Sequence, residues 1–148
     1  MAVKRFAAID VGSFELELGI YEIGKKIGIR RIDYVRHIIA LGKDTYNTGK
    51  ISYELIEEMC SVLSDFAGIM SGYQVDAYRA YATSAMREAR NRRIILDRIR
   101  VRTGIDVRII SNSEQRLINY KAVASLEEGF NSMIEEGAVI ADLGFGSI

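Results

Sequence analysis

An aspartate followed by glycine and serine occurs twice in the chain, each time directly after an apolar run. Asp10 opens the segment DVGS at 10–13, and Asp142 opens DLGFGS at 142–147. A carboxylate at a strand end can orient a hydrated magnesium ion, while glycine lets the backbone approach an anion closely and serine adds a hydroxyl and an amide. Each segment alone is also an ordinary glycine turn. Together they predict two loops that face each other across a phosphate.

A third segment carries polar side chains at the start of a predicted helix. This segment, TSAMREARN at 83–91, begins with Thr83 and contains Arg87. Helix N-termini present free amides to anions, and an arginine adds a bidentate phosphate donor. On composition alone, a capped helix with a solvated basic face is the better explanation.

A fourth segment, SNSEQR at 111–116, also opens a helix. Its spacing matches a capping box, in which the Glu114 carboxylate accepts a hydrogen bond from the Ser111 amide. The functional alternative makes Glu114 a general base that acts on water. The spacing by itself favours the capping box.

Composition narrows the chemistry that the chain can carry. Its 148 residues include 20 basic and 20 acidic side chains, so the whole chain has no net attraction for nucleic acid or an anionic membrane. A single cysteine, Cys60, and a single histidine, His37, argue against a structural zinc site or a Ser-His-Asp triad within this chain. Magnesium, held by carboxylates, phosphates and water, is the metal that fits. Without a signal peptide or a bilayer-spanning apolar run, the expected location is the cytoplasm.

The hydrophobic pattern changes its period after residue 50. Before that point, alternating apolar and polar residues predict three strands that form an antiparallel meander. After it, helices alternate with short strands, which calls for parallel pairing. The predicted strands are 4–10, 15–22, 27–40, 75–82, 106–110 and 138–142. The predicted helices are 52–71, a short helix from Thr83 or Ser84, a helix from Asn91 to Arg102, and 113–128.

This order of elements predicts one mixed five-stranded sheet, with the two later strands parallel to the first. In the last helix, Leu117, Tyr120 and Ala124 are expected to face inward. Because five polar side chains each lie where a strand gives way to a turn or helix, we expect them to converge at one edge of the sheet. These residues are Asp10, Ser13, Thr83, Arg87 and Glu114.

All four segments, in this order, resemble the family of exopolyphosphatases and guanosine pentaphosphate phosphohydrolases. AIDVGS (8–13) is similar to the first phosphate loop of that family, and ADLGFGS (141–147) to the second, DIGGGS. ATSAMREARN (82–91) is the most specific match, close to ATSxxREAxN. ISNSEQRLI (110–118) is similar to ISGxEEARLI but one residue shorter. The resemblance covers the whole chain.

The resemblance implies an α/β fold of the ribonuclease H-like, actin-like ATPase type, with helices on both faces of the sheet. It implies a first lobe at 1–130 and, at 131–148, the opening strand and phosphate loop of a truncated second lobe. The implied activity is metal-dependent hydrolysis of terminal phosphoanhydride bonds in polyphosphate or guanosine pentaphosphate. Asp10 and Asp142 would organise Mg²⁺ or another divalent cation, and Glu114 would position or deprotonate the attacking water. Phosphate would be held by Ser13, Thr83, Arg87, Gly144, Gly146 and Ser147.

Some residues depart from the family pattern. Phe14 and Glu15 stand where the family has Asn-Ser, and Phe145 stands where it has glycine. These departures favour the alternative of a non-catalytic regulatory relative that binds polyphosphate or a nucleotide. Because family members are longer, we expect a fragment that is inactive by itself and whose strand 138–142 is displaced or used for self-association, as in a homodimer. Residues 83–91 disfavour a kinase or chaperone ATPase of the same superfold, and a nucleic-acid binder is the weakest alternative.

Overall fold

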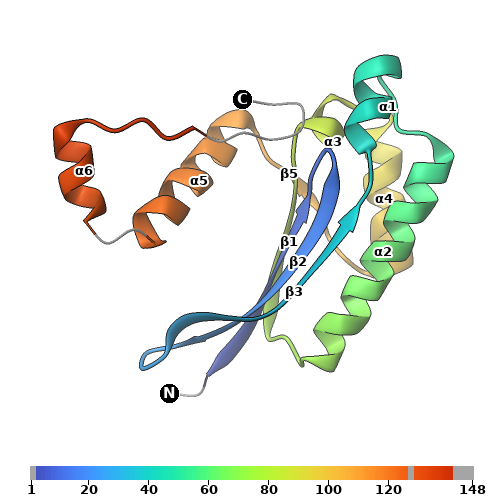
Figure 1. Cartoon of the computed structure of the whole chain (residues 1–148). Helices are drawn as coiled ribbons and strands as arrows, with labels where there is room; N and C mark the ends of the chain where they lie inside the picture. Colours follow the sequence, from blue (N-terminus) through green and yellow to red (C-terminus); the bar gives the residue numbers. More distant parts are fainter. Residues whose placement is uncertain (1–2, 127–128, 142–148) are drawn as a thin grey trace.

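The computed structural model describes residues 3–126 and 129–141, and its centre is a twisted mixed sheet (Figure 1). The strands are β1 (Lys4–Val11), β2 (Glu15–Gly24), β3 (Gly28–Ile38), β4 (Ala77–Ala82) and β5 (Arg108–Ile109). Their order in the sheet is β3-β2-β1-β4-β5. β1, β2 and β3 pair antiparallel, whereas β4 lies parallel to β1 and β5 parallel to β4. The predicted five-stranded mixed sheet is thus confirmed.

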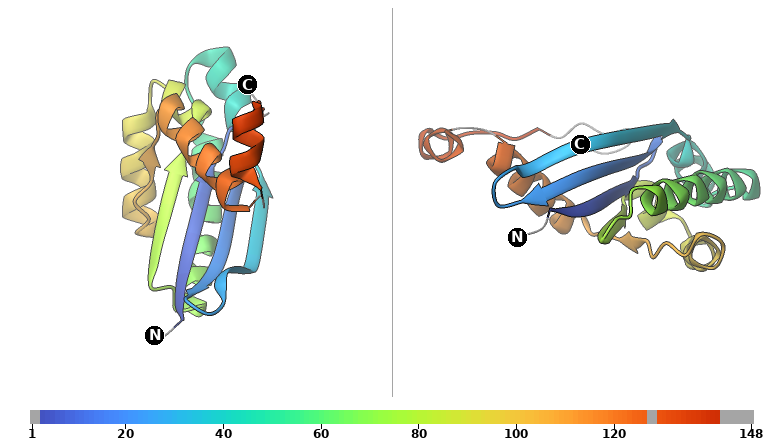
Figure 2. Two further views of the ribbon diagram at one scale, coloured as in Figure 1. Left: turned by 90° about the vertical axis from the view of Figure 1, so that its left-hand side faces the viewer. Right: turned by 90° about the horizontal axis from the view of Figure 1, so that it is seen from below.

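Helices lie on both sides of this sheet. They are α1 (Leu41–Thr48), α2 (Tyr53–Gly72), α3 (Ser84–Glu88), α4 (Arg92–Thr103), α5 (Asn112–Leu126) and α6 (Phe130–Glu136). Figures 1 and 2 show α2 and α4 packed along one face, while α5 and α6 stand on the opposite side. We call the face toward α2 the core face and the other the open face.

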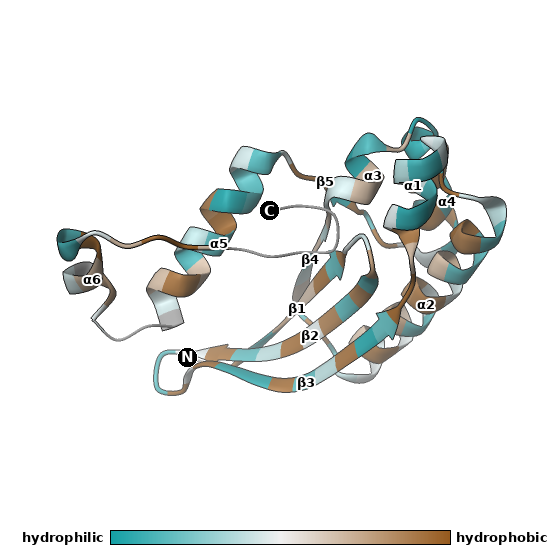
Figure 3. Cartoon of the chain, turned by 45° about the horizontal axis from the view of Figure 1, so that its top comes forward, coloured by the Kyte–Doolittle hydropathy of each residue, from teal (hydrophilic) through white to brown (hydrophobic). Residues whose placement is uncertain are grey.

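The hydrophobic core fills the space between the core face and α2. Along β1, Ala7, Ile9 and Val11 are buried, whereas Ala8 and Asp10 are exposed. Figure 3 shows the same alternation of apolar and polar residues along the strands. Each large apolar side chain buried in this way stabilises the fold by about 1.5–3 kcal/mol. Because the period of a strand is two, the same pattern delivers polar side chains to the open face.

Helix ends lie close to the expected positions, but neither Ser52 nor Asn91 caps its helix through a side-chain hydrogen bond. Ser52 precedes α2, and Gly104 ends α4 in the left-handed conformation. Asn91 precedes α4 without capping it. Its carboxamide accepts a hydrogen bond from the Ile51 amide at 3.2 Å and donates one to the Ile51 carbonyl at 2.8 Å. Asn91 therefore joins α4 to the chain that enters α2.

Three expectations for local structure were wrong. Helices α1 and α6 were not anticipated, and residues 138–141 form no strand, with Val139 95% exposed. In α5, Leu117 and Tyr120 are 52% and 43% exposed rather than inward. The reason is that α5 stands off the open face, and the side chains it turns toward the sheet lie on a different stripe of the helix. Tyr120 instead packs edge-on against Phe130 of α6 at 5.2 Å between ring centres.

The arginine-rich stretch around α4 is largely committed to structure. Arg90 donates to the Thr48 carbonyl at 2.6 Å, and Arg98 and Arg102 both pair with Glu57 on α2. These contacts fasten the chain before α4 to α1 and α4 itself to α2, so the arginine-rich stretch holds more of the fold together than its composition indicates. In the described ranges, no helix is long and apolar enough to cross a membrane.

Candidate functional site

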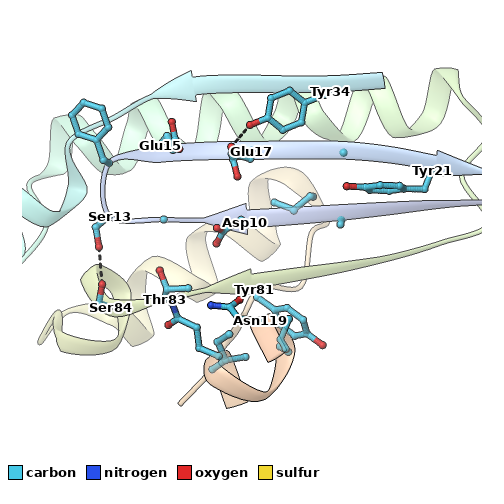
Figure 4. Close-up of a pocket in the computed structure, with 18 residues that line it drawn as sticks. Asp10, Ser13, Glu15, Glu17, Tyr21, Tyr34, Tyr81, Thr83, Ser84 and Asn119 are labelled. Atoms are coloured by element: carbon cyan, nitrogen blue, oxygen red, sulfur yellow. Dashed lines mark hydrogen bonds between the residues drawn. The ribbon is translucent and has the colours of Figure 1, made fainter. Parts of the chain in front are cut away.

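A cavity of about 500 Å³ lies over the open face, where β1 and β4 reach their C-terminal ends (Figure 4). The sheet forms its floor and α5 supplies the opposite wall. The size lies within the range of small-molecule sites. Its polar and charged lining residues are Asp10, Ser13, Glu15, Glu17, Tyr21, Tyr34, Tyr81, Thr83, Ser84, Gln115 and Asn119. The rest of the described lining is glycine, alanine, isoleucine and Phe14.

The turn after β1 is held in place by a ring of three hydroxyl groups. Ser13 Oγ lies 2.8 Å from Ser84 Oγ and 3.0 Å from Tyr46 Oη, and Tyr46 Oη donates to Ser84 Oγ at 3.0 Å. Ser13 Oγ also accepts a hydrogen bond from the Ala85 amide at 3.2 Å. A cyclic orientation uses all three hydroxyl protons inside the ring. The Ser13 hydroxyl is thus used in hydrogen bonds that hold the loop together. To bind a phosphate through this hydroxyl, the ring of three hydroxyls must open.

The sharpness of the same turn depends on Gly12. Its amide donates to the Glu15 carbonyl at 3.0 Å, and a Cβ at this position would lie 2.9 Å from that oxygen. Only glycine allows so close an approach of backbone to backbone. The glycine in the DVGS segment is therefore required by the turn itself.

Oxygen donors gather at the strand ends beside this loop. Asp10 of β1 is directly opposite Glu17 of β2, and Thr83 follows β4, so two carboxylates and one hydroxyl line the same part of the cavity. Such all-oxygen sets suit a hard divalent cation, which often takes one or two carboxylates together with substrate phosphates and water. Within residues 3–126 and 129–141, no three histidine, cysteine or acidic side chains are grouped closely enough to hold a metal alone. The residues present thus fit a cation that is shared with a phosphate.

The carboxylates of β2 are tied to side chains of β3. The Tyr34 hydroxyl donates to Glu17, and the Arg36 guanidinium lies 3.5 Å from Glu15. The hydrogen bond to Glu17, with smaller contributions from burial and the nearby negative charge, raises the pKa of Tyr34 to about 12. Tyr34 therefore stays a neutral donor at physiological pH, and Glu17 is held in place as an acceptor.

Glu114 forms the capping box that its spacing predicts. One carboxylate oxygen accepts from the Ser111 amide at 2.9 Å, the Glu114 amide donates to Ser111 Oγ at 3.2 Å, and Arg108 donates to the other oxygen at 2.9 Å. The bond from the Ser111 amide, followed by those from the Ser111 hydroxyl and Arg108, holds the pKa of Glu114 below its ordinary value. Glu114 is not among the lining residues, and the α5 stripe that faces the cavity is Gln115, Ile118 and Asn119.

Arg87 also points elsewhere, since it donates to the Ile110 carbonyl at 2.8 Å. This bond ties α3 to the chain that follows β5. Among the described residues, no lysine, arginine or histidine lines the cavity. Phosphate binding by Arg87 would require this side chain to leave the carbonyl.

The expected convergence is met by three of five residues. Asp10, Ser13 and Thr83 share the cavity, whereas Arg87 and Glu114 are engaged just outside it. Their catalytic and binding roles stay predictions. The other predicted site residues, Asp142, Gly144, Gly146 and Ser147, lie outside the described residues.

Several residues that line the cavity or support its lining were missed by sequence reasoning, and Tyr46 is one of the supporting residues. Glu17 and Tyr34 share the open face only through strand register, although the alternation in 15–22 already separated Glu17 from the core side chains. Tyr46 lies on α1, whose polar sequence LGKDTYNT gives no helical stripe. Gln115 and Asn119 are one helical turn apart, which is the signal that could have found them.

Comparison with known proteins shows which family this sequence is similar to. The model of the Ppx/GppA phosphatase family matches residues 20–148. Exopolyphosphatase 1 of Mycobacterium tuberculosis is 25% identical over 119 residues, 80% of this chain and 35% of that protein. The bifunctional 3-dehydroquinate synthase/phosphatase of Fusobacterium nucleatum is 27% identical over 147 residues, 95% of this chain and 22% of that protein.

A solved structure gives the same result. The Ppx/GppA family member of Aquifex aeolicus superposes with a TM-score of 0.79 and 31% identity, covering 83% of this chain and 40% of that one. The predicted actin-like ATPase fold is thereby confirmed, while this chain spans well under half the length of these relatives. The fold, the four segments and the family match agree, and the chain belongs to the Ppx/GppA phosphatase family.

Proposed function

We propose that this chain supplies one wall of a site that hydrolyses terminal phosphoanhydride bonds of polyphosphate or guanosine pentaphosphate. The observation that carries the proposal is the meeting of Asp10, Thr83 and the Ser13 turn in one cavity at the ends of β1 and β4. Family membership supports hydrolysis of the exopolyphosphatase type. The division into lobes at 1–130 and 131–148 remains part of this proposal.

Asp10 would hold a divalent cation such as Mg²⁺, together with Glu17, which lies opposite it on β2. Asp142 of the second loop is the further predicted ligand. When bound, it would neutralise charge on the transferring phosphoryl group. The protein's own contribution is positioning, because Asp10 lies on a strand whose other face is buried and the hydroxyl ring holds the turn beside it. Thr83 would orient a phosphate oxygen from the end of β4.

In the reaction, a water oxygen bonds to the terminal phosphorus while the bond to the bridging oxygen breaks and that oxygen leaves with the shortened chain. A water proton must pass to a base. Glu114 is the proposed acceptor, and this role requires its carboxylate to leave the capping box. Within the box, the lowered pKa makes Glu114 a weak base.

A second function, binding without turnover, is favoured by one observation. The side chains of α5 that face the cavity are Gln115, Ile118 and Asn119, and none of them can accept a proton from water. A site built this way could hold a phosphorylated ligand and report its presence. The same experiment separates the two functions.

The test measures phosphate release and tripolyphosphate binding in the presence of Mg²⁺ by the purified chain, beside a longer chain that carries the second lobe as well. Asp10→Asn keeps the shape of the side chain but removes its charge, and Asp65→Asn on the exposed side of α2 is the matched control. Release that Asp10→Asn lowers at least about 100-fold supports hydrolysis, since loss of one group that stabilises transition-state charge costs about 100- to 1,000-fold in rate.

Tripolyphosphate binding without release by either chain, weakened by Asp10→Asn but not by Asp65→Asn, supports the binding function. If neither chain binds or hydrolyses tripolyphosphate, or if the two variants behave alike, the cavity is not a phosphate site and both functions are wrong.

A further inference from the structure

The hydroxyl ring beside the turn after β1 allows one assignment of its protons. Each hydroxyl has a single proton, and Tyr46 Oη donates its proton to Ser84 Oγ. All three bonds then form only if Ser84 donates to Ser13, along the dashed line in Figure 4, and Ser13 donates to Tyr46. The proton of Ser13 is therefore directed to Tyr46.

This arrangement uses the whole hydrogen-bonding capacity of the Ser13 hydroxyl. Its oxygen accepts from Ser84 and from the Ala85 amide at 3.2 Å, which occupies both lone pairs. Ser13 lines the cavity, so a phosphate oxygen there can accept its proton. The bond that must break for this to happen is the bond to Tyr46, which is not itself a lining residue.

The position of the Tyr46 ring does not depend on its hydroxyl alone, because the start of α1 packs against the same turn. The Gly42 amide donates to the Ser13 carbonyl at 2.7 Å. A Cβ at position 42 would lie 2.8 Å from Tyr46 Cε2 and 3.1 Å from Ser13 Cβ, so glycine leaves room for both side chains. Tyr46→Phe should therefore keep the ring in place and remove only its oxygen.

Water has little access to the proton that such a variant would release. Ser13 and Ser84 are 9% and 4% exposed, and the bond between them is buried. A buried donor without a partner destabilises the state in which it occurs. Without the Tyr46 oxygen, the Ser13 proton is unpaired in the unliganded chain and regains a partner when a phosphate oxygen binds.

From this proton count we propose that Tyr46 is a positioning residue that competes with phosphate for the Ser13 proton and so lowers the affinity of the cavity for phosphorylated ligands. The inference rests on the proposed function, because phosphate binding through Ser13 is part of it. It predicts the opposite sign from a purely structural role. Loss of a residue that only supports the turn weakens binding, whereas loss of a competitor strengthens it.

The test is calorimetric titration with tripolyphosphate and Mg²⁺ of the purified chain and of the longer chain that carries the second lobe. Tyr46→Phe should bind tripolyphosphate about 2- to 10-fold more tightly, the equivalent of one hydrogen bond that no longer has to break. Tyr53→Phe on α2 is the matched control. Tyr53 is 59% exposed and accepts a hydrogen bond from Arg98, so this variant also loses a bond but should leave the affinity unchanged.

A double variant shows whether the released proton belongs to Ser13. Ser13→Ala has no hydroxyl to release, so adding Tyr46→Phe to it should give no gain in affinity. Circular dichroism shows whether Ser13→Ala is folded, and the result for Tyr46→Phe alone decides the inference if it is not.

Two outcomes separate this inference from the proposed function. If Tyr46→Phe binds tripolyphosphate as the unaltered chain does, or more weakly, or if its gain persists without the Ser13 hydroxyl, the competition is wrong and the proposed function stands. If neither the chain nor the longer chain binds tripolyphosphate, the proposed function fails and the competition fails with it.

Discussion

Substituting Ser13 by alanine should destabilise the fold more than its size indicates. Ser13 is 9% exposed, and its hydroxyl is the partner of the fully buried Ala85 amide and of Ser84. Without this oxygen, the Ala85 amide is left unpaired at a cost of about 1–3 kcal/mol, whereas Ser84 keeps its bond from Tyr46. Two ring bonds are lost as well: the buried bond to Ser84 adds about 1 kcal/mol, and water can replace the bond to the 42% exposed Tyr46, so the total is about 2–4 kcal/mol.

Tyr46→Phe removes a different corner of the same ring and should cost less. Tyr46 is 42% exposed, so water can replace part of what it loses, and about 0.5–1.5 kcal/mol is expected. Because both variants open one ring, the double variant should cost less than the sum of the two.

Urea denaturation followed by circular dichroism gives the free energy of unfolding for each variant, with the exposed Ser61→Ala on α2 as the control. Ser13→Ala is also expected to weaken tripolyphosphate binding, because the turn beside Asp10 loses its support. Equal costs for Ser13→Ala and Tyr46→Phe would contradict the difference expected from burial, and strictly additive costs would show that the three hydroxyls do not act as a unit.

Three further results are expected. The pKa of Tyr34 is raised to about 12, so its hydrogen bond should contribute stability that is complete below the ordinary pKa of 10.0 and lost as pH rises to about 12. In a spectrophotometric titration, Tyr34→Phe should remove the tyrosine that titrates at the highest pH. Glu114, with its pKa lowered, should contribute stability that is present above its ordinary 4.5 and lost as pH falls through the folded value; melting temperatures of Glu114→Gln that show the same acid dependence as the unaltered chain would contradict this. Asn91→Ala should lower the free energy of unfolding in urea by about 1–3 kcal/mol, because the amide and the carbonyl of buried Ile51 both lose their partner. Asn47→Ala, at an exposed position of α1, should lower it little.

The fold was predictable where one face of an element is buried. In β1 and β2, the core side chains alternate with polar ones, and in α2 they recur at helical spacing, so period and burial coincide. α1 could not be predicted this way because it buries little beyond Leu41, Gly42 and Thr45. Its stability comes from contacts with distant segments, such as the bond from the Gly42 amide to the Ser13 carbonyl at 2.7 Å.

The site was predictable in its location but not in its side-chain directions. Motifs place Asp10, Ser13 and Thr83 at strand ends, and parallel pairing of β1 with β4 brings those ends together. The directions of the Arg87 and Glu114 side chains depend on which nearby groups form hydrogen bonds with them. A backbone carbonyl holds the first and a capping box the second, and neither preference can be weighed from spacing alone.

The hydroxyl ring also has a consequence for the order in which the chain folds. Ser13 and Tyr46 are 33 residues apart, and Ser13 and Ser84 are 71 apart. The β1–β2–β3 meander closes short loops and can form early, whereas the ring must wait until β4 has returned beside β1. The turn beside Asp10 is therefore locked only at the end of folding, and a nascent or partly unfolded chain presents its phosphate-loop residues without a working site.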